Sequence, residues 1–150
     1  MKNLLFAVAI ALAFFFMPVK RVSLSRIAPA EVLMVYRQGE ALVVETDTGS
    51  KGMGSTVENA VERMHETANG DTLLGTVDFL LVDPACAQLL PEMRSFVRSS
   101  VRVCQVTEKP ELEEAAAFLR IHQPKVTLHS AVWDSDLLPV LQTGEEMKLE

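Results

Sequence analysis

The N-terminal nineteen residues constrain this chain most, because an unbroken apolar run over residues 4–17 follows Lys2. Such a run at an N-terminus is typical of a membrane-targeting segment rather than of part of a globular core. Three basic residues follow it by position 26. The folded part of the protein must therefore be built from later residues, and we expect it to work at or beyond a membrane.

Residues 1–19 fit a signal peptide only in part. The basic start and the apolar centre are present, but a cleavage site needs small residues. Phe16, Met17 and Pro18 close the run and are bulky, and the small residues at 28–30 lie far beyond it. No cysteine follows the run directly, so a lipid attachment point is absent from this part of the sequence.

The alternative is an uncleaved membrane anchor. A helical span wants about 20 apolar residues, and residues 4–19 fall slightly short, a deficit that snorkelling of Lys20 and Arg21 can accommodate. We predict an anchored chain with residues 20–30 as a juxtamembrane linker and the domain on the extracytoplasmic side. Cleavage would instead make the protein secreted. The positive charge after the run argues for the opposite topology.

The charge balance after residue 30 excludes one class of partner. Residues 1–30 hold four of the fourteen Lys/Arg and none of the twenty Asp/Glu, which leaves residues 31–150 with a formal charge of −10. A domain this acidic is repelled by nucleic acid and by anionic lipid headgroups. These 120 residues are enough for a single domain with its own core.

The first half of the predicted domain opens with two β-prone runs at residues 32–36 and 41–45 around a glycine-containing turn, the pattern of a β-hairpin. A loop over 46–54 is expected to follow. Ser55 then predicts a helix start, because Glu58 three residues later completes a capping box. The core-facing positions of that helix are Val57, Ala60, Val61, Met64 and Ala68.

The second half alternates strands and helices. An almost wholly apolar run at 73–82 predicts a strand covered on both faces, and Asp83-Pro84 begins a helix interrupted near Pro91. Further segments are expected as a strand at 101–106, a helix after Pro110 with Leu112, Ala115, Ala116 and Leu119 inward, a short strand at 125–129 and a helix at 134–141. The predicted fold is a single α/β domain over 31–150, with a mixed sheet, an opening β-hairpin and three to four helices, preceded by an N-terminal apolar helix.

One candidate interaction site is the loop at the first helix start, where Gly52, Gly54 and Ser55 expose backbone N–H groups that can hold an anion. The spacing differs from a P-loop, and no lysine stands directly before Ser55. The alternative is a flexible connection that ends in a good helix cap.

The two cysteines, Cys86 and Cys104, permit a disulfide in an exported protein. Cys86 falls on the apolar stripe of a predicted helix, and Cys104 lies inside a predicted strand. That placement favours two buried, unpaired thiols that pack as small apolar side chains.

Catalytic and metal-binding patterns are not recognisable in the sequence. His65, His122 and His129 lack the spacing of zinc ligands, and neither a G-x-S-x-G elbow nor an H-E-x-x-H motif occurs. We therefore predict no catalytic residues, no cofactor and no metal. Asp83 is interpreted as a helix cap. Trp133 is interpreted as a partly buried core residue, with an interface anchor as the alternative.

An ordered series of short motifs resembles a known family. Residues 52–60 read G-M-G-S-T-V-E-N-A, residues 77–82 form a buried apolar strand, residues 90–98 read L-P-E-M-R-S-F-V-R, and residues 101–106 carry V-R-V. In this order they resemble the N-terminal domain of the Ger(x)C family, the C-subunits of spore germinant receptors. The segment from residue 137 to the end is also similar to the one that leaves the family's first domain.

The chain departs from that family at several points. The family's lipobox cysteine, its His-x-Lys motif on the buried strand and its Arg-Asp-Pro after the second helix are all missing, as are sequences matching its later domains. The resemblance implies a non-enzymatic, membrane-associated subunit on the outer face of the inner spore membrane. Its partners would be multi-pass receptor subunits, bound by protein–protein contact.

Two other hypotheses stay open at the level of the sequence. One is a small exported enzyme of unknown reaction that uses Asp78, Asp83 or His129 at the edge of the sheet, because α/β sites often lie at strand ends. The other is a truncated remnant of a longer receptor subunit.

Overall fold

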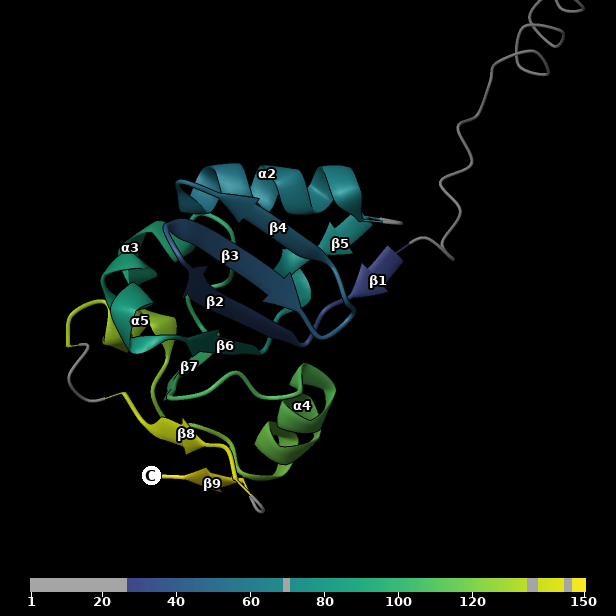
Figure 1. The fold of residues 1–150 in the computed structure, drawn as a ribbon. Coiled ribbons are helices and arrows are strands. Elements are labelled where there is room, and N and C mark those ends of the chain that lie inside the picture. Colours follow the sequence, from purple (N-terminus) through teal and green to yellow (C-terminus); the bar gives the residue numbers. More distant parts are fainter. Residues whose placement is uncertain (1–26, 69–70, 135–137, 145–146) are drawn as a thin grey trace, which may run out of the picture.

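A computed structural model describes residues 27–68, 71–134, 138–144 and 147–150. The expected N-terminal apolar helix and most of the linker lie outside these residues. Where the chain is described, the mixed α/β fold predicted from the sequence is confirmed: a seven-stranded sheet in the order β4-β3-β2-β6-β7-β8-β9 (Figure 1). Within those ranges no helix has both the length and the apolar character needed to cross a bilayer.

The elements follow one another along the chain with short connections. They are β1 (Ile27–Pro29), β2 (Val32–Gln38), β3 (Ala41–Thr46), β4 (Lys51–Gly54), α2 (Val57–Thr67), β5 (Asp71–Leu73), the 3-10 helix η2 (Leu74–Thr76), β6 (Phe79–Val82), the 3-10 helix η3 (Pro84–Leu89), α3 (Leu90–Met93), β7 (Arg102–Val106), α4 (Leu112–Ile121), α5 (Leu128–Ala131), β8 (Val140–Gln142) and β9 (Lys148–Leu149).

The predicted opening hairpin is confirmed. Strands β2 and β3 pair antiparallel, with Gln38 opposite Ala41 across a two-residue turn. Gly39 in that turn has a φ of +65°, a conformation that costs glycine no Cβ clash. Because glycine holds the first central position and the next residue has no positive φ, the turn has the form of a type II′ hairpin turn.

The segment predicted as a loop over 46–54 is wrong in its second half, where residues 51–54 form strand β4 against β3. The strand carries two glycines because α2 packs almost directly on its backbone. A Cβ added to Gly52 would overlap the carbonyl oxygen of Ala60, and one on Gly54 would lie 2.6 Å from the amide nitrogen of Ala60. The glycines therefore serve helix–strand packing here.

The helix cap is displaced by one residue from its predicted place. Thr56 rather than Ser55 is the N-cap of α2, and its side chain accepts a hydrogen bond from the amide of Asn59 at 3.2 Å. The predicted core stripe holds for Val57, Ala60, Val61 and Met64, which are buried. It is wrong for Ala68, which follows the helix as its C-cap and is only partly buried. Val57 starts the helix directly after the cap, so the cap residue and the first core contact are adjacent in sequence.

The apolar run at 73–82 is divided rather than a single strand. Strand β5 pairs parallel with β1 in a separate two-stranded sheet, η2 follows, and only β6 enters the main sheet. Thr76 causes the break: its hydroxyl donates to the carbonyl of Leu73 at 2.7 Å and to that of Ala30 at 3.0 Å. A side chain that satisfies backbone acceptors in this way stabilises a turn over a continued strand.

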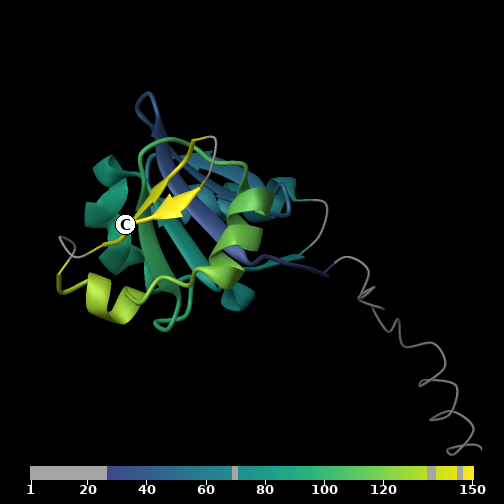
Figure 2. The same cartoon turned by 90° about the horizontal axis from the view of Figure 1, so that it is seen from below.

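Helices cover both faces of the sheet, which gives three layers. Alternate residues of β2 point to opposite sides, so that Leu33 and Val35 join a core with α2, α3 and α5, while Val32 and Met34 join a second core with α4. Figure 2 views the molecule from the side of α4 and the β8–β9 hairpin. The central strands are therefore buried on both faces, as the apolar composition of β2 and β6 predicts.

The predictions for the second half of the domain differ in outcome. The interrupted helix after Asp83 is confirmed as η3 followed by α3, as are β7 and α4. The strand predicted at 125–129 is wrong, because Thr127 makes only one isolated bridge and caps the short helix α5 with Ser130. The helix predicted at 134–141 is wrong at its end, where β8 forms beside β7; residues 135–137 lie outside the described residues.

Candidate functional site

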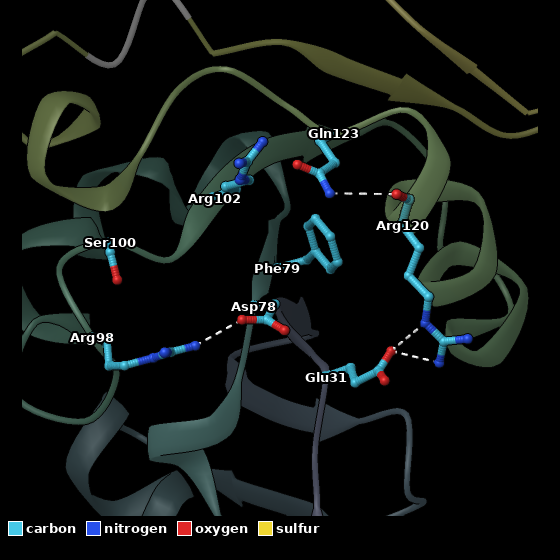
Figure 3. A pocket seen from close by; sticks show the side chains of 8 residues that line it. All are labelled: Glu31, Asp78, Phe79, Arg98, Ser100, Arg102, Arg120 and Gln123. Atoms are coloured by element: carbon cyan, nitrogen blue, oxygen red, sulfur yellow. Dashed lines mark hydrogen bonds and ion pairs between the residues drawn. The ribbon is translucent and has the colours of Figure 1, made fainter.

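A charged hollow lies at the amino-terminal ends of the central parallel strands. It is a pocket of about 420 Å³, and Figure 3 shows its side chains. Glu31 precedes the first residue of β2, Asp78 precedes Phe79 at the start of β6, and Arg102 begins β7. The complete lining is Glu31, Asp78, Phe79, Arg98, Ser100, Arg102, Arg120 and Gln123.

Backbone hydrogen bonds fix three of these residues in a row. The amides of Asp78 and Phe79 both donate to the carbonyl of Glu31, at 2.9 and 3.0 Å, and the amide of Arg102 donates to the carbonyl of Asp78 at 2.9 Å. Asp47, in the turn after β3, accepts from the amide of Glu31 at 3.1 Å. The pocket floor is therefore held by the sheet itself and not by a free loop.

Two arginines reach into the pocket from opposite sides, each toward a carboxylate (Figure 3). From the loop before β7, Arg98 donates to Asp78 Oδ1 at 2.7 Å and to the carbonyl of Val77 at 3.1 Å. From the last turn of α4, Arg120 places Nε and Nη2 at 2.7 and 2.6 Å from Glu31 Oε2. Both pairs are solvent-exposed, so each contributes at most about 1 kcal/mol to stability.

The third arginine differs from the other two. Arg102 donates through Nη1 to the carbonyl of Pro124 at 3.1 Å, and no carboxylate of the described chain forms an ion pair with it. Three guanidinium groups against two carboxylates give the lining a formal charge of +1. A positive hollow in a domain of charge −10 is a local reversal of the field that the composition predicts.

The lining offers hydrogen-bond donors to an anion. Guanidinium groups are rigid donors that fit planar anions, and beside them lies the small exposed part of Phe79, which is otherwise buried in the core. Nucleophilic catalysis would need a base within reach of the nucleophile. Ser100 supplies a hydroxyl, but the eight lining residues include no histidine, cysteine or lysine, and both carboxylates are engaged by arginines. Across the described ranges no cluster of three or more His, Cys, Asp or Glu is placed to hold a metal ion.

The residues predicted as an interaction loop lie elsewhere. Gly52 and Gly54 belong to β4, an edge strand of the sheet, and neither lines the pocket. The hydroxyl of Ser55 accepts from Asn59 Nδ2 at 3.4 Å. Their role as a contact surface stays a prediction, and their place in the fold is the junction of β4 with α2.

Both cysteines are free and fully buried. Cys86 lies in the core shared with α3, whereas Cys104 lies in the core on the other face of the sheet. Burial raises the pKa of both thiols, and that of Cys104 to about 12. A disulfide between them would have to pass through the sheet.

The three residues of the enzyme hypothesis are not brought together. Asp78 and Asp83 lie at opposite ends of β6, and Asp83 caps η3 by accepting from the amide of Ala85 at 2.8 Å, as predicted. His129 lies in α5, where its amide donates to the carbonyl of Ser99. The prediction for Trp133 is wrong, because this side chain is 77% exposed directly after α5.

A second charged cluster ties the loop after β7 to the opening hairpin. Glu45 on β3 accepts from the hydroxyl of Tyr36 at 2.8 Å and from Lys109 Nζ at 2.9 and 2.7 Å. Burial raises the pKa of Glu45, but the hydrogen bonds from Lys109 and Tyr36 outweigh it, so that the pKa falls below its ordinary value. The ammonium groups of Lys109 and Lys51 flank the Tyr36 ring at 5.3 and 5.7 Å, and the cluster stabilises the fold.

The pocket arginines were not predicted from the sequence. Arg98 and Arg102 stand on either side of the start of a predicted strand, and Arg120 follows on a predicted helix, but no local motif joins the three. Comparison of the chain with models of protein families, with curated proteins and with solved structures finds no match. The resemblance to the Ger(x)C family therefore stays a prediction.

Proposed function

We propose that this protein is a non-enzymatic binding module, held at a membrane by residues 4–19, that acts through protein–protein contact. The observation that carries the proposal is the arginine-lined pocket. It offers guanidinium donors and an aromatic ring on a rigid floor, and its lining lacks a paired nucleophile and base. A site with these properties is suited to recognition rather than to turnover.

Two exposed apolar side chains, one of them next in sequence to a pocket residue, support a protein partner. Ile121 is 78% exposed and follows the pocket residue Arg120, and Trp133 is 77% exposed. Tryptophan and arginine are enriched at the centres of protein interfaces, where a few such residues supply most of the binding energy. An apolar residue beside a charged pocket matches that composition.

The resemblance to Ger(x)C proteins supplies the partner in this proposal. The chain would act like the N-terminal domain of a germinant-receptor C-subunit, on the extracytoplasmic side, and bind multi-pass receptor subunits. The acidic surface of the domain is compatible with a protein partner, whereas it opposes binding to nucleic acid.

Recovery of the partner from membranes tests the proposal. The full chain carries a C-terminal tag, is purified from solubilised membranes of the sporulating source cells, and its companions are identified by mass spectrometry. Ile121→Ser removes an exposed apolar side chain near the pocket, and Met53→Ser is the matched control, because Met53 is also exposed but lies on β4.

We expect multi-pass receptor subunits with the wild type and with Met53→Ser, and their loss with Ile121→Ser. Recovery of the chain from the soluble fraction without a partner would overturn both the membrane residence and the partner. If all three proteins recovered the receptor subunits equally, Ile121 and the residues around it would not be part of the interface.

A further inference from the structure

We infer that the arginine pocket is a binding site for a carboxylate carried on a short apolar stem, with Arg102 as its principal ligand. The inference rests on the proposed function only in that the pocket binds a ligand. It does not depend on membrane residence or on the identity of the partner protein.

The pocket already displays the geometry that a carboxylate requires. Arg120 grips one carboxylate oxygen of Glu31 with two nitrogens, and Arg98 holds Asp78 at 2.7 Å. A guanidinium has five N–H donors. In the described part of the chain, Arg102 uses them only toward the carbonyl of Pro124, so it has donors left to bind an incoming group.

The net charge of the lining favours a ligand that carries one negative charge. The three arginines exceed the two carboxylates by one, which a monoanion neutralises. A phosphate dianion would meet the carboxylates of Asp78 and Glu31 at close range, and like charges at such distances repel. The lining also lacks lysine, a point charge that many phosphate sites use.

The remaining lining residues suit the stem of the ligand. Phe79 belongs to the core on the α4 face and is only 4% exposed, so only the small part of it that lines the pocket can contact methylene groups. Gln123 is held by a hydrogen bond from its Nε2 to the carbonyl of Arg120 at 3.4 Å. A volume of about 420 Å³ is at the small end of ligand pockets. A partner's glutamate side chain and a free short-chain acid share this chemistry.

A titration of the full chain in detergent micelles tests the inference. The ¹⁵N-labelled protein is titrated with butyrate at constant ionic strength, with chloride as the balancing anion, and the arginine Nε–H signals are followed by NMR. We expect saturable shifts that include Arg102. Arg102→Gln should weaken binding at least tenfold, because a hydrogen bond to a charged group contributes that much or more.

Two further variants make the result specific. Arg63→Gln, on the exposed face of α2 and without an ion pair in the described chain, removes the same charge far from the pocket and should leave binding unchanged. Arg102→Lys keeps the charge but loses the planar fork, so it should bind with intermediate affinity. If Arg102→Gln does not fold, the affinity of the lysine variant and the shift of the Arg102 signal in the wild type test whether Arg102 binds the carboxylate.

Blocked Ala-Glu-Ala peptide distinguishes the two sources of the carboxylate. Tighter binding of the peptide than of butyrate supports a protein side chain as ligand, and the reverse order supports a free acid. Three results would overturn the inference. The first is a set of shifts that never saturates, the second is tighter binding of phosphate than of butyrate, and the third is an unchanged affinity for butyrate in Arg102→Gln. Because partner recovery is measured separately, carboxylate binding can fail while the proposed function stands, and the reverse.

Discussion

Replacement of Gly52 by alanine probes the closest approach in the fold, that of α2 to β4. The new Cβ would overlap the carbonyl oxygen of Ala60 and would lie 2.5 Å from the amide nitrogen of Met64. Both are backbone atoms of a helix and cannot rotate aside. Strand and helix must therefore separate, and the buried face of α2 must lose part of its packing.

The expected cost follows from that separation. A radial gap of about 0.5–1 Å forfeits a quarter to a half of the dispersion energy of each contact across it, and overpacking typically costs about 1–3 kcal/mol. Because the overlap at Gly52 involves backbone on both sides, we expect a loss of about 3 kcal/mol. For a domain of this size such a loss lowers the Tm by roughly 10 °C.

Thermal unfolding of the full chain in mild detergent, followed by circular dichroism, measures the effect against two matched controls. Gly75→Ala meets no atom within 4 Å and has no positive φ, so it should be neutral or stabilise by about 0.4–1 kcal/mol. Gly39→Ala also meets no atom but has a φ of +65°, so it should cost roughly 1–2 kcal/mol through backbone strain alone.

The order of the three variants carries the test. Gly52→Ala should be the least stable, Gly39→Ala intermediate and Gly75→Ala the most stable. A Tm for Gly52→Ala equal to that of Gly75→Ala would refute the seating of α2 on β4, and with it the assignment of residues 51–54 as a strand beneath a helix.

Four other outcomes follow from the structure. The pKa of Glu45 is lowered in the fold, so its ionised form stabilises the protein above the unfolded pKa, and this contribution is lost as the pH falls through the folded pKa. Glu45→Gln should therefore flatten the acid side of a stability–pH curve from urea unfolding. Lys109→Met should raise the pKa of Glu45, since Lys109 donates two hydrogen bonds to it, and an NMR titration of the Glu45 carboxyl carbon checks this. Asp83→Ala should cost about 1 kcal/mol in urea unfolding through the lost cap, whereas a lost enzymatic activity would revive the enzyme hypothesis. Cys86 and Cys104 should react with a thiol reagent only as fast as the domain opens, because both are buried with raised pKa values; rapid labelling of the native protein would contradict their burial.

Local periodicity predicted the elements that bury one continuous face. The spacing of Leu112, Ala115, Ala116 and Leu119 places four side chains on one side of a helix, and all four are buried in α4. The opening hairpin could also be predicted, because its turn needs a residue that tolerates positive φ and Gly39 is such a residue. In both cases the information lies within a dozen residues of sequence.

Elements defined by distant partners were not predicted. Strand β4 has two glycines in four residues, and glycine is depleted in strands. The strand forms by pairing with β3, and its glycines leave room for the backbone of α2. Strand β8 is three residues long and pairs with β7 through only two of them, Val140 and Leu141. A pattern this short cannot distinguish a strand from the end of a helix.

The pocket illustrates the same limit for function. Arg98, Arg102 and Arg120 come from a loop, a strand and a helix, and each alone reads as an ordinary surface arginine. They lie close together because the parallel strands β2, β6 and β7 all begin at the same end of the sheet. Only the strand order, which a single sequence does not contain, would have indicated the cluster.

The position of β2 has a mechanical consequence. The segment from the N-terminus enters the sheet not at an edge but through a strand paired over six residues with β3 and over four with β6. Tension applied ahead of Ile27 would first load the pairing of β1 with β5 and then these hydrogen bonds of β2, which share the load where the pull runs along the strand. Glu150, by contrast, follows the edge strand β9 and is held by two backbone hydrogen bonds with Val140. Tension on Glu150 would break these bonds one after the other. In a domain tethered by its N-terminus, the segment next to the tether would therefore resist tension more than the C-terminal segment does.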